Sequence, residues 1–152
     1  MDLDRRRSEN VLHVKAEDFF VAMLQTAVEE GEILTLIKAP ITTGEKTAYL
    51  KVAQSASGFA VCGIAARLQI GSGNSCDAAY VAVTGVADKA YRAKAVEAEL
   101  VGKRLTDDVI AAAASHAADD VDPLSDIHAS SDYRAHLARV YARRAVAAAL
   151  ES

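Results

Sequence analysis

Two apolar segments joined by a short polar loop constrain the fold of this chain more than any other feature. The first, FAVCGIAARLQI, spans residues 59–70, and the second, DAAYVAVTGV, spans residues 77–86. The loop between them, GSGNSC, is rich in residues that favour turns. This arrangement predicts an antiparallel hairpin running from Ile70 into Ala79. Apolar residues of the first segment fall at odd and even positions, so we expect both faces of that strand to be partly covered.

Helical patterns replace the strand patterns after Gly85. The segment YRAKAVEAELVGK, residues 91–103, has apolar residues at helical spacing and ends at Gly102, a typical C-terminal stop. Thr106 is the expected N-cap of a second helix, whose first turn carries two aspartates that the helix dipole favours. We expect Asp122-Pro123 to end this second helix.

A third and longest helix is predicted in the last 23 residues, SSDYRAHLARVYARRAVAAALES, with Ser130 or Ser131 as its cap. Its expected apolar face comprises Tyr133, Leu137, Val140, Tyr141 and Ala145. Because strands come first and helices afterwards, we predict an α+β fold. In this fold an antiparallel sheet of about three to four strands is covered on one face by three C-terminal helices.

The N-terminal part is shorter and less regular. ILTLIKA, residues 33–39, predicts a strand that follows a turn at Gly31. The arginines at positions 5–7 are expected in a solvated, frayed terminus. No apolar run follows them, so we do not expect a secretory signal. Nor does any segment approach the apolar length of a membrane span.

Charge and cysteine content narrow the function classes. A formal net charge of -4 without a basic face argues against nucleic-acid binding. Cys62 lies in an apolar run and is expected to be a small core residue, whereas Cys76 lies beside a turn. A cross-strand disulfide is the alternative, but two thiols make a poor disulfide framework. We therefore expect a reducing, cytoplasmic environment.

A self-contained active site cannot be assembled from the polar residues. The four histidines, His13, His116, His128 and His136, form no metal-ligand pair. The pair Asp107-Asp108 is explained by helix capping, and Asp119-Asp120 is expected to be solvent-exposed. The loop GSGNS lacks the lysine of a phosphate-binding loop and precedes a strand, so it predicts only a turn. No nucleophile and base can be paired from spacing.

Tyr49 and Lys51 are the remaining candidates for function. Residues two apart on a strand point to the same face. An aromatic ring and an ammonium group placed there can meet one flat, electron-rich partner. The alternative is an edge strand on which the lysine simply extends its charged end into water.

Three segments together resemble a known family. They are AYLKVAQSASGFAVCGIAA, VAVTGVADKAYRAKAVEAEL and SDIHASSDYRAHLARVYARRAV, in this order. They look like the Tyr-x-Lys segment, the strand-to-helix turn and the closing helix in the C-terminal domain of the FAD-binding medium subunit of molybdenum hydroxylases, the carbon monoxide dehydrogenase and xanthine dehydrogenase-like enzymes. AEDFFVAMLQTAVEEGEILTLIKAP, residues 16–40, looks like the end of the preceding FAD-binding domain in that subunit.

The resemblance implies a domain division and a cofactor site. Residues 1–40 are expected to be a remnant of the FAD-binding domain, and residues 41–152 the C-terminal domain. In the family, FAD takes electrons from iron–sulfur clusters and passes them to an external acceptor. By position, Tyr49 looks like the residue that lies against the isoalloxazine ring, and Lys51 like a cation that favours the reduced, anionic flavin. Tyr133 and Arg134 resemble the family's closing-helix pair and are expected to be structural.

The resemblance also implies partners. The Gly-rich loops that hold the FAD pyrophosphate in the family have no counterpart before Ala16. We therefore expect a truncated subunit, an isolated domain or a split gene product that alone binds no FAD and is inactive. Its partners would be the FAD-binding domain, an iron–sulfur small subunit and a molybdenum large subunit, with a homodimer also expected. The alternative is a stand-alone assembly module without redox activity.

Overall fold

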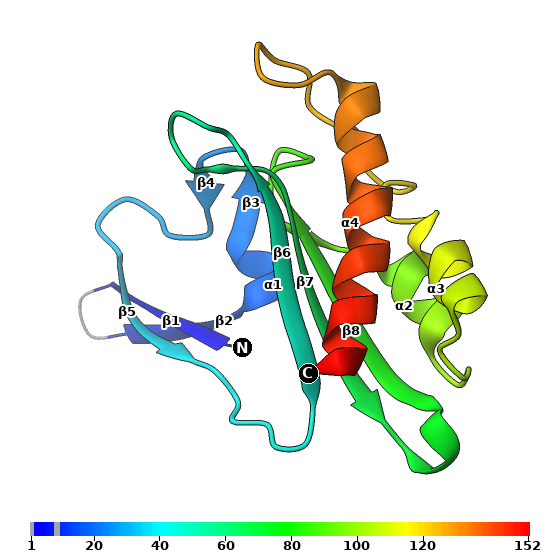
Figure 1. The fold of residues 1–152 in the computed structure, drawn as a ribbon. Helices are drawn as coiled ribbons and strands as arrows, with labels where there is room; N and C mark the ends of the chain where they lie inside the picture. Colours follow the sequence, from blue (N-terminus) through cyan, green and yellow to red (C-terminus); the bar gives the residue numbers. More distant parts are fainter. Residues whose placement is uncertain (1, 8–9) are drawn as a thin grey trace. The chain divides into compact units, whose positions relative to one another are not determined.

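The computed structural model describes residues 2–7 and 10–152 and divides the chain into two compact units, Met1–Thr43 and Gly44–Ser152. Figure 1 shows the strands and helices of both units. No helix in the described ranges is long and apolar enough to cross a membrane.

Unit 1 is built from short strands. Three of them form an antiparallel sheet in the order β2-β1-β5, two others form a small ribbon, and a single helical turn lies between β2 and β3. The elements are β1 (Asp2–Arg7), β2 (Asn10–Lys15), α1 (Ala16–Phe19), β3 (Phe20–Ala22), β4 (Gln25–Thr26) and β5 (Ile33–Lys38). The predicted strand at residues 33–39 is confirmed as β5.

The expectation of a frayed N-terminus was wrong. The arginines at positions 5–7 lie in β1, which pairs with β2 on one side and β5 on the other. Two neighbouring strands satisfy the backbone groups of β1, and Leu3 is buried between Val14 and Ile37 in the register. Backbone pairing and one buried side chain therefore order this segment despite its charge.

Unit 1 buries little of its apolar surface. Leu3 and Phe19 are buried, whereas all four large apolar residues of β5 are exposed: Ile33, Leu34, Leu36 and Ile37. Successive strand residues point to opposite faces, so both faces of β5 present apolar side chains. A strand with this pattern is typical of a sheet covered on both faces.

Unit 2 contains the predicted sheet. Its four strands are antiparallel and adjacent in sequence order: β6 (Lys46–Ala53), β7 (Ala60–Ile70), β8 (Cys76–Thr84) and β9 (Tyr91–Arg92). The hairpin from Ile70 into β8 is confirmed, and the loop GSGNS forms its turn, with the single-turn helix η1 at Ser72–Asn74.

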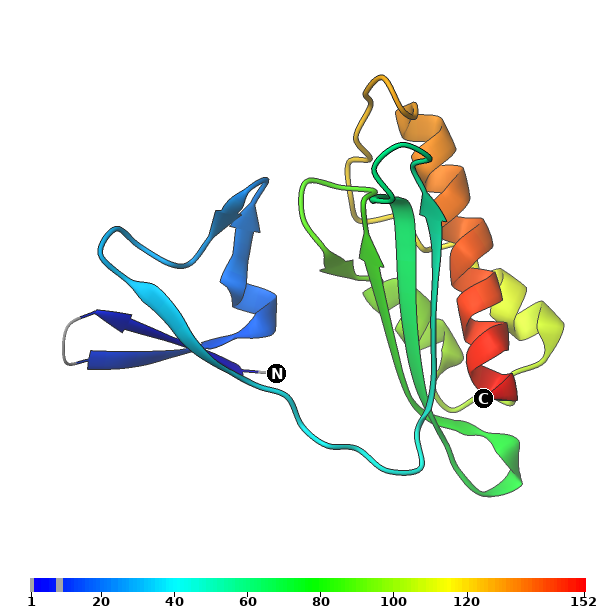
Figure 2. The same cartoon turned by 60° about the vertical axis from the view of Figure 1, so that its left-hand side comes forward.

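Three helices follow the strands, as predicted: α2 (Lys94–Leu100), α3 (Asp107–Ala114) and α4 (Ser131–Glu151). Helix α4 packs on β6 and β7, α2 packs on β8, and α3 packs on both other helices. Figure 2 shows these helices on one face of the sheet. The α+β fold is therefore confirmed, and all three helices of unit 2 lie on the same face of its sheet.

The capping predictions at two helices are confirmed. Thr106 Oγ1 accepts a hydrogen bond of 3.4 Å from the Val109 amide, and Ser130 Oγ accepts one of 3.3 Å from the Tyr133 amide. Gly102 follows the end of α2 with a φ of +79°, a left-handed conformation that glycine adopts without strain.

Two helix boundaries differ from the prediction. Tyr91 and Arg92 were expected in a helix but form β9, paired with Val83 and Ala82. The Tyr91 hydroxyl donates to the Ala117 carbonyl at 2.9 Å, so tertiary contacts outweigh the local helical pattern. Helix α3 ends at Ala114, well before Asp122-Pro123. There the hydroxyl of Ser115 donates to the Ala112 carbonyl at 2.6 Å, a local bond that competes with helix continuation.

The core lies between the sheet and the helices. Alternate residues of β7 point into it, joined by residues of β8, α2 and α4: Cys62, Ile64, Ala66, Leu68, Val81, Val83, Leu100 and Val146.

Both cysteines are buried free thiols. Cys62 is therefore confirmed as a core residue, and Cys76 is buried beside its turn. Burial raises the pKa of Cys62 to about 11, so this thiol is a poor nucleophile near neutral pH.

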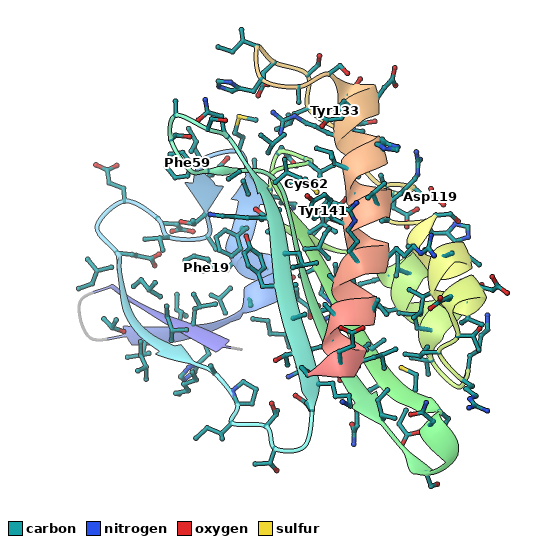
Figure 3. The ribbon with its side chains drawn as sticks, in the orientation of Figure 1. Phe19, Phe59, Cys62, Asp119, Tyr133 and Tyr141 are labelled. Carbon is teal, nitrogen blue, oxygen red and sulfur yellow. The ribbon has the colours of Figure 1, made fainter. Side chains whose placement is uncertain are left out.

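Two residues expected to pack are exposed instead. Phe59 precedes β7 and is 79% exposed, and Tyr133 on α4 is 50% exposed. The buried face of α4 begins at Arg134 rather than Tyr133 and continues through Leu137, Ala138, Ala142 and Ala145. Figure 3 shows Phe59, Tyr133 and Tyr141 in place on the ribbon.

Arg134 joins three parts of unit 2. Its Nη1 donates to the Val61 carbonyl at 2.8 Å and to the Gly85 carbonyl at 2.6 Å, while Nη2 donates to Asp126 Oδ2 at 2.7 Å. The guanidinium therefore connects the start of β7, the end of β8 and the loop before α4. Its buried position agrees with the structural role expected for it.

The Asp126 carboxylate makes the hydrogen bond between Arg134 and the loop before α4 sensitive to acid. The hydrogen bond from Arg134, followed by those from the His128 and Ala129 amides, lowers the pKa of Asp126 from 3.8 to about 2. A lowered folded-state pKa contributes stability above pH 3.8, which is lost as the pH falls through about 2. We expect Asp126→Asn to flatten the pH dependence of the unfolding free energy between these values, as measured by urea denaturation. An unfolding free energy that depends on pH equally in Asp126→Asn and in the unchanged chain would contradict this prediction.

Candidate functional site

The face of the unit 2 sheet opposite the three helices of this unit carries both residues singled out from the sequence. On β6 the side chains of Lys46, Ala48, Leu50 and Val52 are half-buried on the helix side, whereas Thr47, Tyr49 and Lys51 are exposed on the other side. Strand alternation therefore places Tyr49 and Lys51 on one face, as their spacing predicted. We call this surface the open face.

The strand register fixes which residues neighbour them. Tyr49 lies opposite Ala65 of β7, which in turn lies opposite Ala82 of β8. Lys51 lies opposite Gly63, which lies opposite Thr84. The residues next to Tyr49 and Lys51 on β7 and β8 are therefore small: Ala65, Ala82, Gly63 and Thr84.

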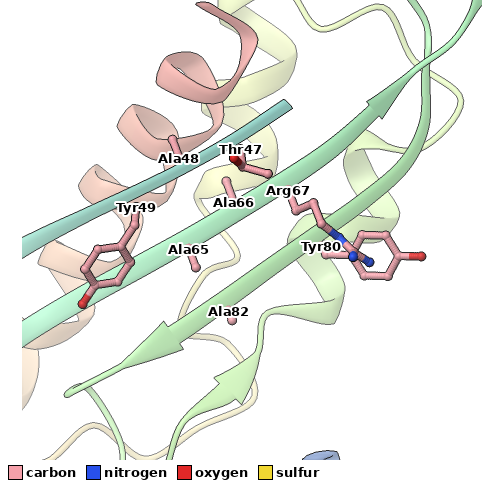
Figure 4. A pocket seen from close by; sticks show the side chains of 8 residues that line it. All are labelled: Thr47, Ala48, Tyr49, Ala65, Ala66, Arg67, Tyr80 and Ala82. Atoms are coloured by element: carbon pink, nitrogen blue, oxygen red, sulfur yellow. The ribbon is translucent and has the colours of Figure 1, made fainter. Parts of the chain in front are cut away.

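The ring of Tyr49 packs against the backbone of the neighbouring strand β7. Its side chain is 56% exposed, and an alanine Cβ at Gly63 would lie only 2.6 Å from its hydroxyl oxygen. The ring therefore leans diagonally from β6 toward Gly63 on β7. Figure 4 shows it to one side of Ala65, its direct partner. One side of an aromatic ring is left available to a flat partner.

Lys51 is engaged by the loop between β6 and β7. Its Nζ donates to the Gly58 carbonyl at 2.9 Å. The same loop is closed by backbone bonds from Gln54 to Phe59 and from Gly58 to Gln54, each 2.8 Å long. The ammonium group is therefore held at the end of the open face rather than over the ring of Tyr49.

A shallow depression of about 510 Å³ lies next to Tyr49. Figure 4 shows its lining residues, Thr47, Ala48, Tyr49, Ala65, Ala66, Arg67, Tyr80 and Ala82. Gly63, Arg67 and Tyr80 were not identified from the sequence. Alternation along β7 and β8 places them on the open face, but the sequence alone does not give the register that brings them near Tyr49.

Tyr80 is held between two arginines. The guanidinium carbon of Arg67 lies 4.0 Å from the centre of its ring, and that of Arg92 lies 4.8 Å from it. Arg92 donates to both oxygens of the buried Glu97 carboxylate, at 2.5 and 2.7 Å, and Glu97 also accepts from the Val81 amide at 2.8 Å. Arg67 in turn lies 3.5 Å from the Glu45 carboxylate, so both arginines are ion-paired. This network fixes the aromatic ring of Tyr80 and two guanidinium groups at one border of the open face.

The other polar candidates are not brought together. His116 Nδ1 lies 2.6 Å from Asp119 Oδ2 in an exposed pair, and Asp107 and Asp108 lie in the first turn of α3. Across residues 2–7 and 10–152, no three histidine, cysteine, aspartate or glutamate side chains are grouped as metal ligands would be.

Comparison with known proteins identifies the family. Residues 47–149 match the family described as the CO dehydrogenase flavoprotein C-terminal domain. The chain belongs to this family. The match covers Tyr49, Lys51, the helices α2 and α3 and all but the last two residues of α4. The open face is therefore part of a flavoprotein C-terminal domain.

Individual relatives agree with this assignment. The glyceraldehyde dehydrogenase medium chain of Sulfolobus acidocaldarius is 36% identical over 132 residues, which are 87% of this chain and 47% of the relative. The carbon monoxide dehydrogenase medium chain of Hydrogenophaga pseudoflava is 31% identical over 137 residues, 90% of this chain and 47% of the relative. The chain spans about half the length of these relatives.

A solved structure supports the fold. Carbon monoxide dehydrogenase from Hydrogenophaga pseudoflava, in a form lacking the Mo-pyranopterin moiety of its cofactor, superposes with a TM-score of 0.92 at 30% identity. The superposition covers 99% of this chain and 52% of the other.

A flavoprotein family implies a flavin, and the open face suits part of one. The exposed ring of Tyr49 and the small residues Ala65 and Ala82 can accept a planar ring system, with cations at both ends of the surface. A pyrophosphate is disfavoured at the helix N-termini of unit 2, because α2, α3 and α4 each carry a carboxylate in the first turn. The residues present therefore fit the ring of FAD but offer its phosphates no helix terminus in this unit.

Proposed function

We propose that this chain supplies the C-terminal domain of an FAD-dependent oxidoreductase subunit of the molybdenum hydroxylase type. The single observation that carries the proposal is the open face of unit 2. It is an exposed sheet surface bearing Tyr49 and Lys51 in a chain that belongs to a flavoprotein family. Bound FAD would supply the electron transfer between iron–sulfur clusters and an external acceptor.

The proposed roles of the two residues follow from their positions. Tyr49 offers an exposed aromatic surface against which a flat ring can stack. Lys51 provides positive charge near the same surface, and a cation stabilises an anionic ring. Its bond to the Gly58 carbonyl orders the long lysine side chain, which reduces the entropy lost on binding.

We further propose that residues 1–40 belong to an FAD-binding domain completed by polypeptide outside the present sequence. Both faces of β5 expose apolar side chains, which favours burial against further protein. The relatives contain about as much additional chain as the matched part. An iron–sulfur small subunit and a molybdenum large subunit complete the proposed assembly, which the relatives named as medium chains support.

Affinity purification from the native cell tests this proposal. We expect the tagged chain to bring flavin, iron and molybdenum with its companion polypeptides, and the chain purified alone to retain no FAD. Absorbance spectroscopy and metal analysis measure both results. Stoichiometric FAD on the isolated chain would contradict the proposed location of the pyrophosphate site.

A stand-alone assembly module is the second candidate function. The exposed apolar residues of β5 favour it, because such a surface can also support self-association into a homodimer. Companion proteins without flavin, or a flavin-free dimer in sedimentation velocity, would support this alternative. Neighbouring genes for iron–sulfur and molybdenum subunits would favour the oxidoreductase.

A further inference from the structure

Gly63 lies on the open face where the ends of the Tyr49 and Thr84 side chains leave no room for a further side chain. It lies opposite Lys51 and diagonally across from Tyr49, whose direct partner is Ala65. A Cβ at Gly63 would lie 2.6 Å from Tyr49 Oη and 3.3 Å from Tyr49 Cζ. The end of the tyrosine ring therefore occupies the space that any other residue at position 63 would fill.

The direction of the ring determines what else the open face exposes. Diagonal neighbours in an antiparallel pair are within reach of an aromatic side chain, so Tyr49 can lean toward Gly63 or cover Ala65. It leans toward Gly63, and Figure 4 shows the ring to one side of Ala65, which remains exposed. Ala65 and Ala82 then form the floor of the depression beside the ring. A ring that covered Ala65 would fill that depression.

We propose that Gly63 is a positioning residue for Tyr49. By leaving room for the phenol, it lets the ring lie diagonally from β6 onto β7 and keeps the small-residue floor open for a planar ligand. The identity of that ligand as the ring of FAD rests on the proposed function above. The position of the tyrosine ring is a property of this chain and can be measured without a flavin.

Alanine at position 63 is an informative change. Gly63 lies outside the left-handed region, so its backbone conformation does not demand glycine. The obstacles to a methyl group are the far end of the Tyr49 side chain and Thr84 Cγ2 at 3.0 Å. An exposed ring end moves more readily than backbone, so we expect Gly63→Ala to fold and to displace the ring.

Nuclear magnetic resonance of the full chain with labelled tyrosine rings tests the positioning directly. In the original chain we expect a nuclear Overhauser effect between the Tyr49 ring and the Gly63 α-protons. In Gly63→Ala the ring resonances of Tyr49 should shift and lose their original contacts, while those of Tyr133, a similarly exposed tyrosine on α4, stay unchanged. Unchanged Tyr49 resonances in Gly63→Ala would overturn the proposal.

The flavin-loaded complex provides the second measurement. We expect Gly63→Ala to weaken FAD binding to the complex by roughly two- to tenfold, the range given by loss of one aromatic contact. In a Tyr49→Leu background the same change should have no further effect, because no ring remains to be displaced. An equal loss in both backgrounds would show that Gly63 does not act through Tyr49.

The two measurements separate the positioning inference from the proposed function. A complex without flavin would refute the proposed function, whereas the ring resonances would still decide the role of Gly63. Flavin binding combined with an unmoved ring would refute the positioning role alone.

Discussion

Replacement of Arg134 by methionine is expected to lower the free energy of unfolding of unit 2 by about 2–4 kcal/mol. Methionine retains most of the apolar stem, so the change removes chiefly the guanidinium. The Val61 and Gly85 carbonyls then lose charge-assisted hydrogen bonds of 2.8 and 2.6 Å in a poorly solvated place. Leaving such acceptors unpaired costs more than an average hydrogen bond contributes.

The matched control for this change is Arg143→Met on the same helix. Arg143 is exposed, so we expect its replacement to change stability by no more than about 0.5 kcal/mol. Urea denaturation followed by circular dichroism measures both variants. A similar small effect at the two positions would mean that the Arg134 bonds do not hold the strand ends together.

Local signals in the sequence predicted most of unit 2. Turn residues located the hairpin between β7 and β8, and hydroxyl groups at Thr106 and Ser130 located two helix starts. These features depend on residues only a few positions apart, and for that reason they can be inferred without a structure.

Two of the errors concern residues whose partners are distant in sequence. Tyr91 was expected in a helix, yet its hydroxyl bonds to Ala117, 26 residues away. Arg134 occupies a buried position where Tyr133 was expected, because its carbonyl partners lie 49 and 73 residues away. Periodicity alone favours burial of the more apolar residue and cannot include such bonds.

In the candidate site, too, local features could be predicted and long-range ones could not. The alternation of side chains along β6 was enough to place Tyr49 and Lys51 on the same face. The contributions of Gly63, Arg67 and Tyr80 depend on the register of β6, β7 and β8, which includes irregularities at Val52/Ala53 and Gln69/Ile70. Each irregularity offsets the pairing that lies beyond it, so cross-strand neighbours cannot be counted from the sequence.

Gly85→Ala is expected to destabilise unit 2 by about 3 kcal/mol through two separate costs. Gly85 has a φ of +79°, and a non-glycine residue there costs roughly 1–2 kcal/mol. Its new Cβ would also lie 2.5 Å from the Ala60 carbonyl oxygen and 2.9 Å from that of Val61. Both atoms belong to the backbone, so relieving the overlap must move the start of β7, adding roughly 1–3 kcal/mol.

Gly102→Ala separates these two costs. Gly102 has the same φ of +79°, but a Cβ there would meet nothing within 4 Å. We therefore expect this control to lose only the conformational part, about 1–2 kcal/mol, when thermal or urea unfolding is measured. The difference between the variants isolates the contact of Gly85 with β7, where Val61 also binds Arg134. Equal losses at the two glycines would mean that β7 yields freely there, and that Arg134 does not anchor a rigid strand end.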